Sequence, residues 1–358
     1  MTRHARQGTS LSKRSRIMNP IQRVGVINWD CALPSTTFFG GYATKSLGEP
    51  KFRDRIPYYA LDREGGKIDF PERTQEAYDR EMQYAIDAGI DYFAYCWYDR
   101  VPHQDHVDTS AATTVDAHVC ELVGARMRHL QSPLRDTLHL CAILINVHPY
   151  RDEELQDLAE TMKEKCYEKI QGRPLVFFFT APWEDVQGRL RTFCREAGVP
   201  DPFFVLMTPD APPPPGSDID ALSAYACGVH TGTYRGLSQE CLKANALRAS
   251  GTFPSIPLFV TGWDPAPRIA HPVPWCAYST DPCAPKATPD QLLEAAKSLK
   301  DWMQENSGAS RLQHVLTFAW NEFEEGAWIC PTKDSPTGLN RERLDAFRKI
   351  TELWRQTP

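Results

Sequence analysis

The chain has 358 residues, enough for one large domain or two ordinary ones, and a hydrophobic content of 42% that excludes wholesale disorder. Its formal net charge of -6 argues against a nucleic-acid-binding surface as the main functional feature. No run of about eighteen apolar residues is present, so the sequence predicts no membrane span.

Residues 1–20 are predicted to form a flexible basic leader in front of a single domain, residues 21–358. Its Lys and Arg residues are Arg3, Arg6, Lys13, Arg14 and Arg16. No apolar segment follows them, which is not the pattern of a secretory signal. A natural leader, a cloning remnant and a start codon upstream of Met18 stay open as explanations. We expect a cytoplasmic location, with export of a form that starts elsewhere also left open.

After the leader, apolar runs of strand type alternate with amphipathic runs. The expected strands are 23–30, 90–98, 138–147, 174–180, 203–208, 221–227, 256–263 and 314–320. The expected helices are 71–88, 114–130, 153–170, 183–197, 237–249, 289–305 and 341–354. The proline-rich stretch 209–216 leaves the helix after the fifth strand weak or missing, and long loops follow the first and seventh strands.

Eight strands with helices between them indicate parallel pairing through crossovers. Burial on both faces explains why these strands are almost continuously apolar. We therefore predict a (β/α)8 barrel with long loops at the carboxyl ends of its strands. A doubly wound open sheet is the alternative. In a barrel of this type the functional site lies at those carboxyl ends.

The eighth strand ends in Trp320-Asn321, followed by Glu322, Glu324 and Glu325 within four positions. Carboxylates this close raise one another's pKa when they are partly desolvated. Cleavage of a glycosidic bond needs one protonated and one ionised carboxyl group, so we interpret the cluster as an acid/base site. An acidic solvated loop is the alternative. We expect Glu322 and Glu325 to face a shared hollow and not to be ion-paired in the interior.

Polar residues with aromatic neighbours recur at five strand ends, a composition typical of a sugar site. The predicted substrate-binding residues are Trp29, Asp30, Tyr59, Tyr98, His148, Trp263, Asp264, Arg268, Trp320, Asn321 and Glu324. Alternatives stay open for several of them. Asp30 is equally suited to capping the next loop, and Arg268 to pairing with a loop carboxylate instead of an anionic sugar. Because neighbouring side chains alternate along a strand, only one of Trp97 and Tyr98 can face the site.

The segment Asn321-Glu322-Phe323-Glu324-Glu325-Gly326 resembles the Asn-Glu-aromatic-x-Glu-Gly signature of glycoside hydrolase family 99 and its WbsX-like relatives. Three further segments are similar in the same chain order, namely 89–98, 167–174 and 261–268. The resemblance covers most of residues 24–328, and it implies a (β/α)8 barrel that cleaves α-mannosidic bonds with retention and without metal.

By position, the resemblance makes Glu325 the general acid/base. It makes Glu322 the residue that assists the substrate's 2-hydroxyl as internal nucleophile. Glu324 departs from the family, which commonly has His or Gly there, and Phe323 replaces the usual Trp. The spacing leaves the geometry open. Three residues of extended chain span about 10 Å, whereas one helical turn brings Cβ atoms to about 5–6 Å.

The sequence calls for no cofactor, since it contains no P-loop, dinucleotide-binding glycine pattern or Gly-x-Ser-x-Gly elbow. His103, Asp105, His106 and Asp108 resemble a metal cluster only faintly, and we expect no metal. The eleven cysteines fit reduced thiols, with a Cys276–Cys283 pair left open.

We predict a glycoside hydrolase acting on a poly- or oligosaccharide through Glu322 and Glu325, with a carbohydrate as its partner and no nucleic acid. A glycosyltransferase-like enzyme of polysaccharide biosynthesis and a non-catalytic carbohydrate-binding barrel are the alternatives. The sugar, the linkage, endo or exo action and the oligomeric state are not fixed by the sequence.

Overall fold

The structure is a computed structural model that describes residues 20–101, 115, 117–145, 150–180, 185–207, 213, 218–281, 283–335 and 338–357. The predicted leader lies outside this range except for its last residue. His148 and the faint metal cluster at 103–108 also lie outside the described residues. Within the described part of the chain, no helix is long and apolar enough to cross a membrane.

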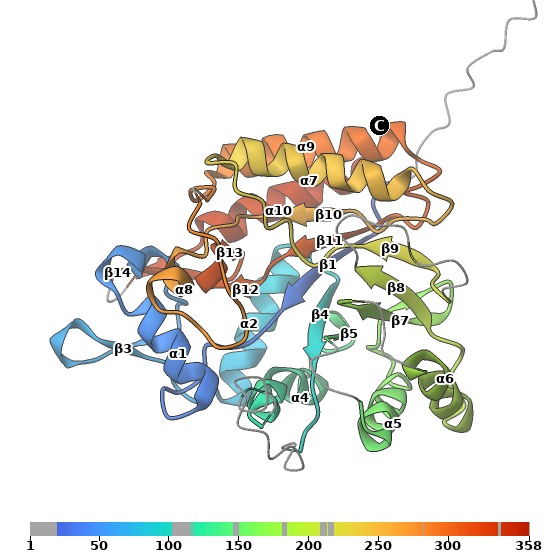
Figure 1. Cartoon of the computed structure of the whole chain (residues 1–358), viewed down its shortest axis with the longest axis horizontal. Helices are drawn as coiled ribbons and strands as arrows, with labels where there is room; N and C mark the ends of the chain where they lie inside the picture. The colour runs from blue at the N-terminus through green and yellow to red at the C-terminus, as the bar shows by residue number, and fades with distance from the viewer. Residues whose placement is uncertain are drawn as a thin grey trace, which may run out of the picture.

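Eight parallel strands form a nearly closed barrel in the order β10-β11-β1-β4-β5-β7-β8-β9 (Figure 1). Their bounds are β1 Arg23–Asn28, β4 Tyr92–Trp97, β5 His139–Leu144, β7 Arg173–Phe178, β8 Phe203–Met207, β9 Ala221–Ser223, β10 Leu258–Val260 and β11 His314–Phe318. A parallel bridge between Leu222 and Ser255 links β9 to the segment before β10. Each strand falls within one of the predicted segments except at the start of β7, and the (β/α)8 barrel is confirmed.

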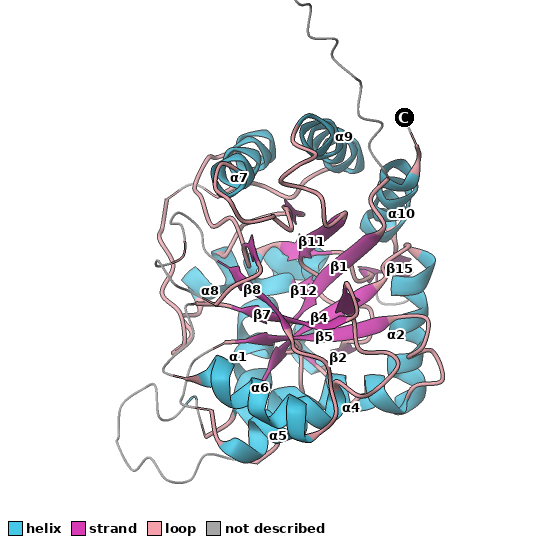
Figure 2. Cartoon of the chain, turned by 90° about the vertical axis from the view of Figure 1, so that its right-hand side faces the viewer, coloured by secondary structure: helices cyan, strands magenta, loops and turns pink. Residues whose placement is uncertain are grey.

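Helices surround the strands in both views (Figures 1 and 2). They are α2 Gln75–Asp87, α4 Gly124–Gln131, α5 Asp152–Thr161, α6 Val186–Glu196, α7 Tyr234–Ala249, α9 Pro289–Glu305 and α10 Glu342–Arg355. The 3-10 helix Val119–Val123 precedes α4 and takes part of the helix expected at 114–130. Between β8 and β9 the structure describes only residues 213 and 218–220, so the weak or missing helix that the prolines predict stays a prediction.

Several predicted boundaries are wrong, and two of them have a clear local cause. The helix expected over 153–170 ends at Thr161, and β6 (Lys169–Ile170) pairs antiparallel with β7. The helix expected from Pro71 begins only at Gln75, because the side chain of Thr74 accepts a hydrogen bond from the Ala77 amide and caps the first turn there.

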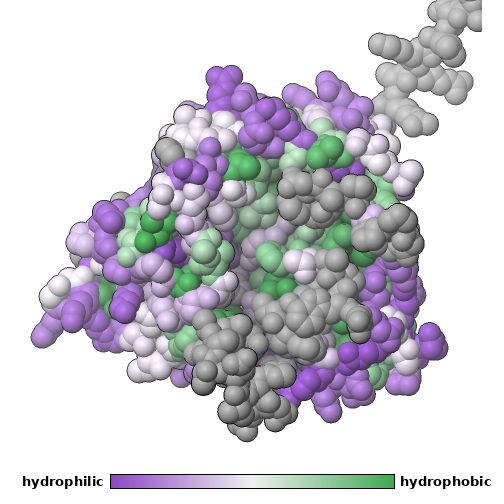
Figure 3. Space-filling model, viewed as in Figure 1, coloured by the Kyte–Doolittle hydropathy of each residue, from purple (hydrophilic) through white to green (hydrophobic). Residues whose placement is uncertain are grey.

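The loop after β1 contains a helix that the sequence did not predict, α1 (Phe38–Leu47), capped by Thr37. Beyond α1, β2 (Leu61–Asp62) and β3 (Ile68–Asp69) form a small antiparallel hairpin. The hairpin projects from the left of Figure 1 and is strongly hydrophilic in the space-filling view (Figure 3). A second short helix, α8 (Ala266–Ala270), lies in the loop after β10, and β14 (Thr332–Ser335) pairs with β15 (Gly338–Asn340) after β11.

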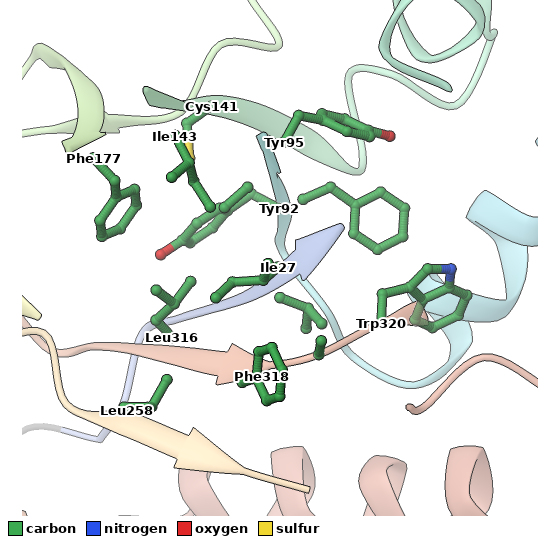
Figure 4. Packing of buried hydrophobic residues seen from close by; sticks show 14 of the residues in the cluster. Ile27, Tyr92, Tyr95, Cys141, Ile143, Phe177, Leu258, Leu316, Phe318 and Trp320 are labelled. Carbon is green, nitrogen blue, oxygen red and sulfur yellow. The ribbon is translucent and has the colours of Figure 1, made fainter. Parts of the chain in front are cut away.

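Large apolar side chains fill the barrel interior (Figure 4). Tyr92 of β4 lies against Gly25 of β1, where a Cβ would stand 2.1 Å from the tyrosine Cζ, so only glycine fits beneath this ring. Trp320 lies on the other side of β11, toward α2 (Figure 4), where its indole donates a 2.7 Å hydrogen bond to Glu81. The interior is thus packed, and the functional site has to lie above it.

The amino end of the barrel carries a buried ion network around Glu168. The starting residues of three strands surround it: Arg23 and His139 hydrogen-bond its carboxylate, and His314 Nε2 lies 3.7 Å away. Burial alone would raise the pKa of Glu168, but the hydrogen bonds from His139 and Arg23 and the nearby His314 outweigh it and lower the pKa well below its ordinary value. The network therefore ties β1, β5 and β11 together.

Replacing Glu168 by Gln should destabilise the protein by about 3 kcal/mol at neutral pH, because it leaves the half-buried guanidinium of Arg23 without its buried carboxylate partner. Since the folded-state pKa is lowered, this stabilisation is present above the ordinary glutamate pKa of about 4.3 and is lost as the pH falls below it. Chemical denaturation at pH 7 and pH 3 measures both effects. Glu164→Gln, on a half-exposed side chain nearby, should change stability by less than about 1 kcal/mol. Equal effects of the two variants would contradict the stabilising role of Glu168.

Candidate active site

A tight turn after β11 presents the three glutamates. β12 (Asn321–Glu322) and β13 (Ala327–Trp328) pair antiparallel around a 3-10 turn, Phe323–Glu325. Glu322 precedes this turn and Glu325 ends it, and both project to the same side, where Arg268 contacts both of them. The spacing of Glu322 and Glu325 allowed an extended chain or a helical turn between them, and the structure has the turn.

The turn depends on two glycines that let the loop after β10 approach it. Gly326 has φ 78°, and a Cβ on it would lie 2.7 Å from the Asp264 amide nitrogen. A Cβ on Gly262 would lie 2.0 Å from the Gly326 carbonyl oxygen. This closeness allows Asp264 to donate its amide to the Glu325 carbonyl at 2.6 Å. The two loops are therefore packed backbone to backbone.

Arg268 of α8 lies among the three carboxylates. Its Nη1 donates to Glu325 Oε1, and its Nη2 lies 3.5 Å from Glu322 Oε2 and 3.4 Å from Glu324 Oε2. The exposed fractions are 2% for Arg268, 2% for Glu322, 1% for Glu324 and 8% for Glu325. One guanidinium therefore bridges both proposed catalytic carboxylates in a desolvated site.

Burial raises the pKa of Glu322 well above its ordinary value, and the charge of Glu325 adds to the shift while Arg268 and a hydrogen bond from Tyr225 oppose it. The hydroxyl of Tyr225 donates to Glu322 Oε1 at 2.9 Å. Burial lowers the pKa of Arg268, but the charges of Glu324 and Glu325 outweigh this effect and raise its pKa well above the ordinary value. The cluster consequently surrounds one positive charge, and burial favours the protonated form of Glu322.

Glu324 is fixed from the opposite side. Ser46 of α1 donates to its Oε1, and the thiol of Cys31 donates to its Oε2 at 3.3 Å. Burial and the charge of Glu324 raise the pKa of the Cys31 thiol, which stays protonated as a donor. Glu324 therefore connects α1 to Arg268.

Aromatic rings cover Arg268. Its Cζ lies 5.0 Å from the ring centroid of Trp29, 5.9 Å from Trp275 and 5.7 Å from Tyr278. Tyr278 also donates a 2.6 Å hydrogen bond to Glu325 Oε1. The buried indole N–H groups of Trp263 and Trp275 have no hydrogen-bond partner among the described residues. Such groups remain available to a bound hydroxyl.

Most of the predicted site residues come together here. Besides the glutamates and Arg268, Trp29 lies at the cluster, its indole donating to the Tyr98 hydroxyl at 3.0 Å, while Trp97 faces away under Arg126. Asn321 accepts the Trp29 amide at 2.9 Å. Trp263 packs 6.3 Å from Tyr278. Asp264 pairs with Arg55 and so fixes its loop.

Three predicted residues lie elsewhere. Asp30 pairs with Arg73, which also pairs with Glu81 and lies 4.7 Å above the Tyr59 ring. Asp30, Tyr59 and Trp320 therefore belong to an internal network between β1 and α2, and the structure does not bring them to the glutamates. Asp30 therefore has a structural role, as an ion-pair partner of Arg73. Trp320 faces α2 because its indole donates to Glu81.

Sequence reasoning missed Tyr225, Trp275, Tyr278 and Ser46. Tyr225 lies two residues after the end of β9, and an aromatic residue near a strand end was a signal that could have been used. Trp275 and Tyr278 lie deep in the long loop after β10, and Ser46 lies in the unpredicted α1, so no local pattern marked them.

We expected Glu322 and Glu325 to face a shared hollow without ion pairs in the interior, and this expectation is wrong. Both carboxylates are ion-paired with Arg268 beneath Trp275 and Tyr278. Arg268 thus follows the alternative in which it pairs with carboxylates of the chain. Cys276 and Cys283 are both free thiols, so the disulfide that the sequence left open is not formed.

No protein-family model matches this sequence, and no curated protein matches it. The fold is similar to the glycoside hydrolase family 99 endo-α-mannosidase from Bacteroides thetaiotaomicron. A complex of that enzyme with bis-tris propane aligns with a TM-score of 0.55 and 12% identity over 93% of this chain and 97% of that chain. A second structure of it gives 0.52 and 13%, over 85% and 86%. At this identity the likeness shows the barrel fold alone.

Glu322→Gln should stabilise the protein at pH 7.5 by about 1–3 kcal/mol, because it removes a carboxyl group that folding keeps from ionising. The folded-state pKa is raised, so the native Glu322 lowers stability as the pH rises above about 4.3. Urea denaturation should therefore show the gain at pH 7.5 and none at pH 4. Glu352→Gln, on an exposed residue of α10, is the matched control. A destabilised Glu322→Gln protein at pH 7.5 would contradict the protonated state.

Proposed function

We propose that the protein is a glycoside hydrolase that cleaves a poly- or oligosaccharide with Glu322 and Glu325 as its working carboxyl groups. The observation that carries the proposal is the pair itself. Two carboxyl groups from one turn at the carboxyl end of β11 contact the same guanidinium, and burial raises the pKa of one of them. Acid/base cleavage requires a pair that shares one proton.

The surroundings of the pair support a saccharide as the ligand. Trp29, Trp275 and Tyr278 offer aromatic surface, and the unpaired indole N–H groups of Trp263 and Trp275 offer donors to hydroxyl groups. Retention of configuration and an α-mannoside-like linkage belong to the proposal through the resemblance to family 99. That enzyme's barrel aligns with almost the whole chain.

We assign the roles as the resemblance implies, with Glu325 as general acid/base and Glu322 acting on the 2-hydroxyl. Burial favours the protonated form of Glu322, so in this proposal a proton passes from Glu322 to Glu325 before the glycosidic oxygen is protonated. Arg268 and Tyr278 both donate to Glu325 Oε1, the oxygen that would otherwise receive the proton. A substrate that displaces Arg268 and Tyr278 frees this oxygen, so binding and proton transfer are linked.

A carbohydrate-binding barrel without turnover is the second candidate, and one observation favours it. Arg268 contacts both carboxyl groups in the interior and is itself buried under aromatic rings. If that arrangement persists with a saccharide bound, the protein binds glycans and does not cleave them.

Hydrolysis of α-mannan, mannooligosaccharides and 2,4-dinitrophenyl α-mannoside tests the proposal and the roles together. Glu322→Gln and Glu325→Gln should each lower turnover of oligosaccharides by about 10²–10⁴-fold, the usual contribution of acid/base catalysis. The dinitrophenolate leaving group needs no protonation. Glu325→Gln should therefore retain most of its activity on the aryl substrate, and Glu322→Gln should lose it.

Glu352→Gln should behave like the wild type, and circular dichroism should confirm that all variants are folded. The reverse pattern on the aryl substrate would exchange the two roles. Saccharide binding by the wild type without product from any of these substrates would support the second candidate.

A further inference from the structure

A large cavity lies beside the candidate active site, on the far side of α1. Its volume is about 940 Å³, within the range of ligand-binding pockets. Its walls come from three loops: the loop after β1 with α1 and the β2–β3 hairpin, the loop after β10 with His271, and the loop after β11 with Lys333. All three loops follow carboxyl ends of barrel strands, so the cavity opens on the face that carries the glutamates.

The charges around this cavity do not balance. Four cationic side chains line it, Lys45, Arg53, Lys67 and Lys333, against two carboxylates, Glu49 and Asp62. Asp62 is already paired with Arg53 at 3.3 Å and with Lys333 at 2.8 Å. Glu49 is paired with Lys51 at 2.8 Å and with His271 at 2.6 Å.

Lys45 and Lys67 have no ion-pair partner within the part of the chain that the structure describes. Both are exposed, and both line the same cavity. The hydroxyl of Thr44, also in the wall, is inaccessible to solvent and has no hydrogen-bond partner among the described residues. The cavity therefore offers two exposed ammonium groups to a ligand, whereas the Thr44 hydroxyl is covered in this structure.

The hairpin side of the cavity is held in place. Gly65 and Gly66 have φ 68° and 71°, and this turn directs the Gly66 carbonyl to the guanidinium of Arg53. Lys333 of β14 reaches Asp62 of the same hairpin. The hydrophilic hairpin at the left of Figure 3 is thus tied to both walls of the cavity.

The cavity and the glutamate cluster share a wall. On one side of α1, Ser46 bonds to Glu324, and on the other side Thr44 and Lys45 line the cavity. Arg268 and His271 lie three residues apart at α8 and divide between the two sites in the same way. A chain-like ligand on this face can therefore reach both.

We propose that this cavity is a subsite for a negatively charged group on a glycan, bound by Lys45 and Lys67. The saccharide part of the proposal rests on the function proposed above, and the charge part rests on the cavity. The substrate class is then an acidic poly- or oligosaccharide, one that bears carboxylate, sulfate or phosphate groups. The aliphatic stems of the lysines pack along the sugar, and their ammonium groups pair with the acid.

Isothermal titration calorimetry with a charge-matched pair of probes tests the subsite. Tetragalacturonate carries carboxylates, and its methyl ester is the same saccharide without them. The full chain should bind the acid form at least tenfold more tightly than the ester, and added NaCl should weaken that binding. Lys45→Ala/Lys67→Ala should remove the preference.

Lys297→Ala/Lys349→Ala removes the same charge from exposed, unpaired lysines of α9 and α10 and should keep the preference. Inorganic phosphate is the third probe. Millimolar phosphate should compete with the acidic saccharide for the wild type and should not do so for Lys45→Ala/Lys67→Ala. This result would support an anion site in the cavity. Equal binding of acid and ester, or the same loss in both double variants, overturns the subsite.

Repeating the titration with Glu325→Gln separates this inference from the proposed function. Selective binding with no hydrolysis of any glycan by the wild type would sink the enzymatic proposal and leave the anion site standing. If the wild type and Lys45→Ala/Lys67→Ala both hydrolyse acidic and neutral substrates equally well, the subsite is contradicted and the enzymatic proposal is not.

Discussion

The guanidinium of Arg268 holds the candidate site together, because three buried carboxylates cannot share a small volume without a compensating charge. Desolvation and mutual repulsion both disfavour their ionised forms. Arg268 contacts all three, and burial still raises the pKa of Glu322 well above its ordinary value. The loop after β10 and the turn after β11 are fixed to each other through this contact and through the close approach of Gly262 to Gly326.

The same interaction distinguishes this barrel from a simple pair of catalytic acids. Glu324 adds a third negative charge, and it connects Arg268 to Ser46 of α1. Aromatic rings over the guanidinium keep water away and strengthen each charge contact. A substrate at this site must compete with Arg268 for the carboxylates, and in the proposed mechanism that competition couples glycan binding to proton transfer.

Long loops at one end of the barrel carry all the chemistry described. The loop after β1 supplies the wall between the glutamates and the basic cavity, and the loops after β10 and β11 contribute to both. The opposite end carries the Glu168 network, whose role is structural. This division follows the general rule for parallel barrels, in which activity and stability reside at opposite ends of the strands.

The sequence by itself determined the barrel and the position of the acids. Apolar strands buried on both faces have a strong local signal, and so do the acids at the end of the eighth strand. The seven helices were predicted from their amphipathic patterns. The pattern did not show that α2 begins at the Thr74 cap, or that α5 ends at Thr161 before β6 pairs with β7.

Only the tertiary structure decided which side chains meet. Trp320 lies beside Glu322 in the chain yet faces α2, and Asp30 is drawn to Arg73. Tyr225, Tyr278 and Ser46 reach the glutamates from three distant segments. Contacts between such segments depend on loop paths and on charge balance in the folded interior, and the pattern within any one segment does not encode them.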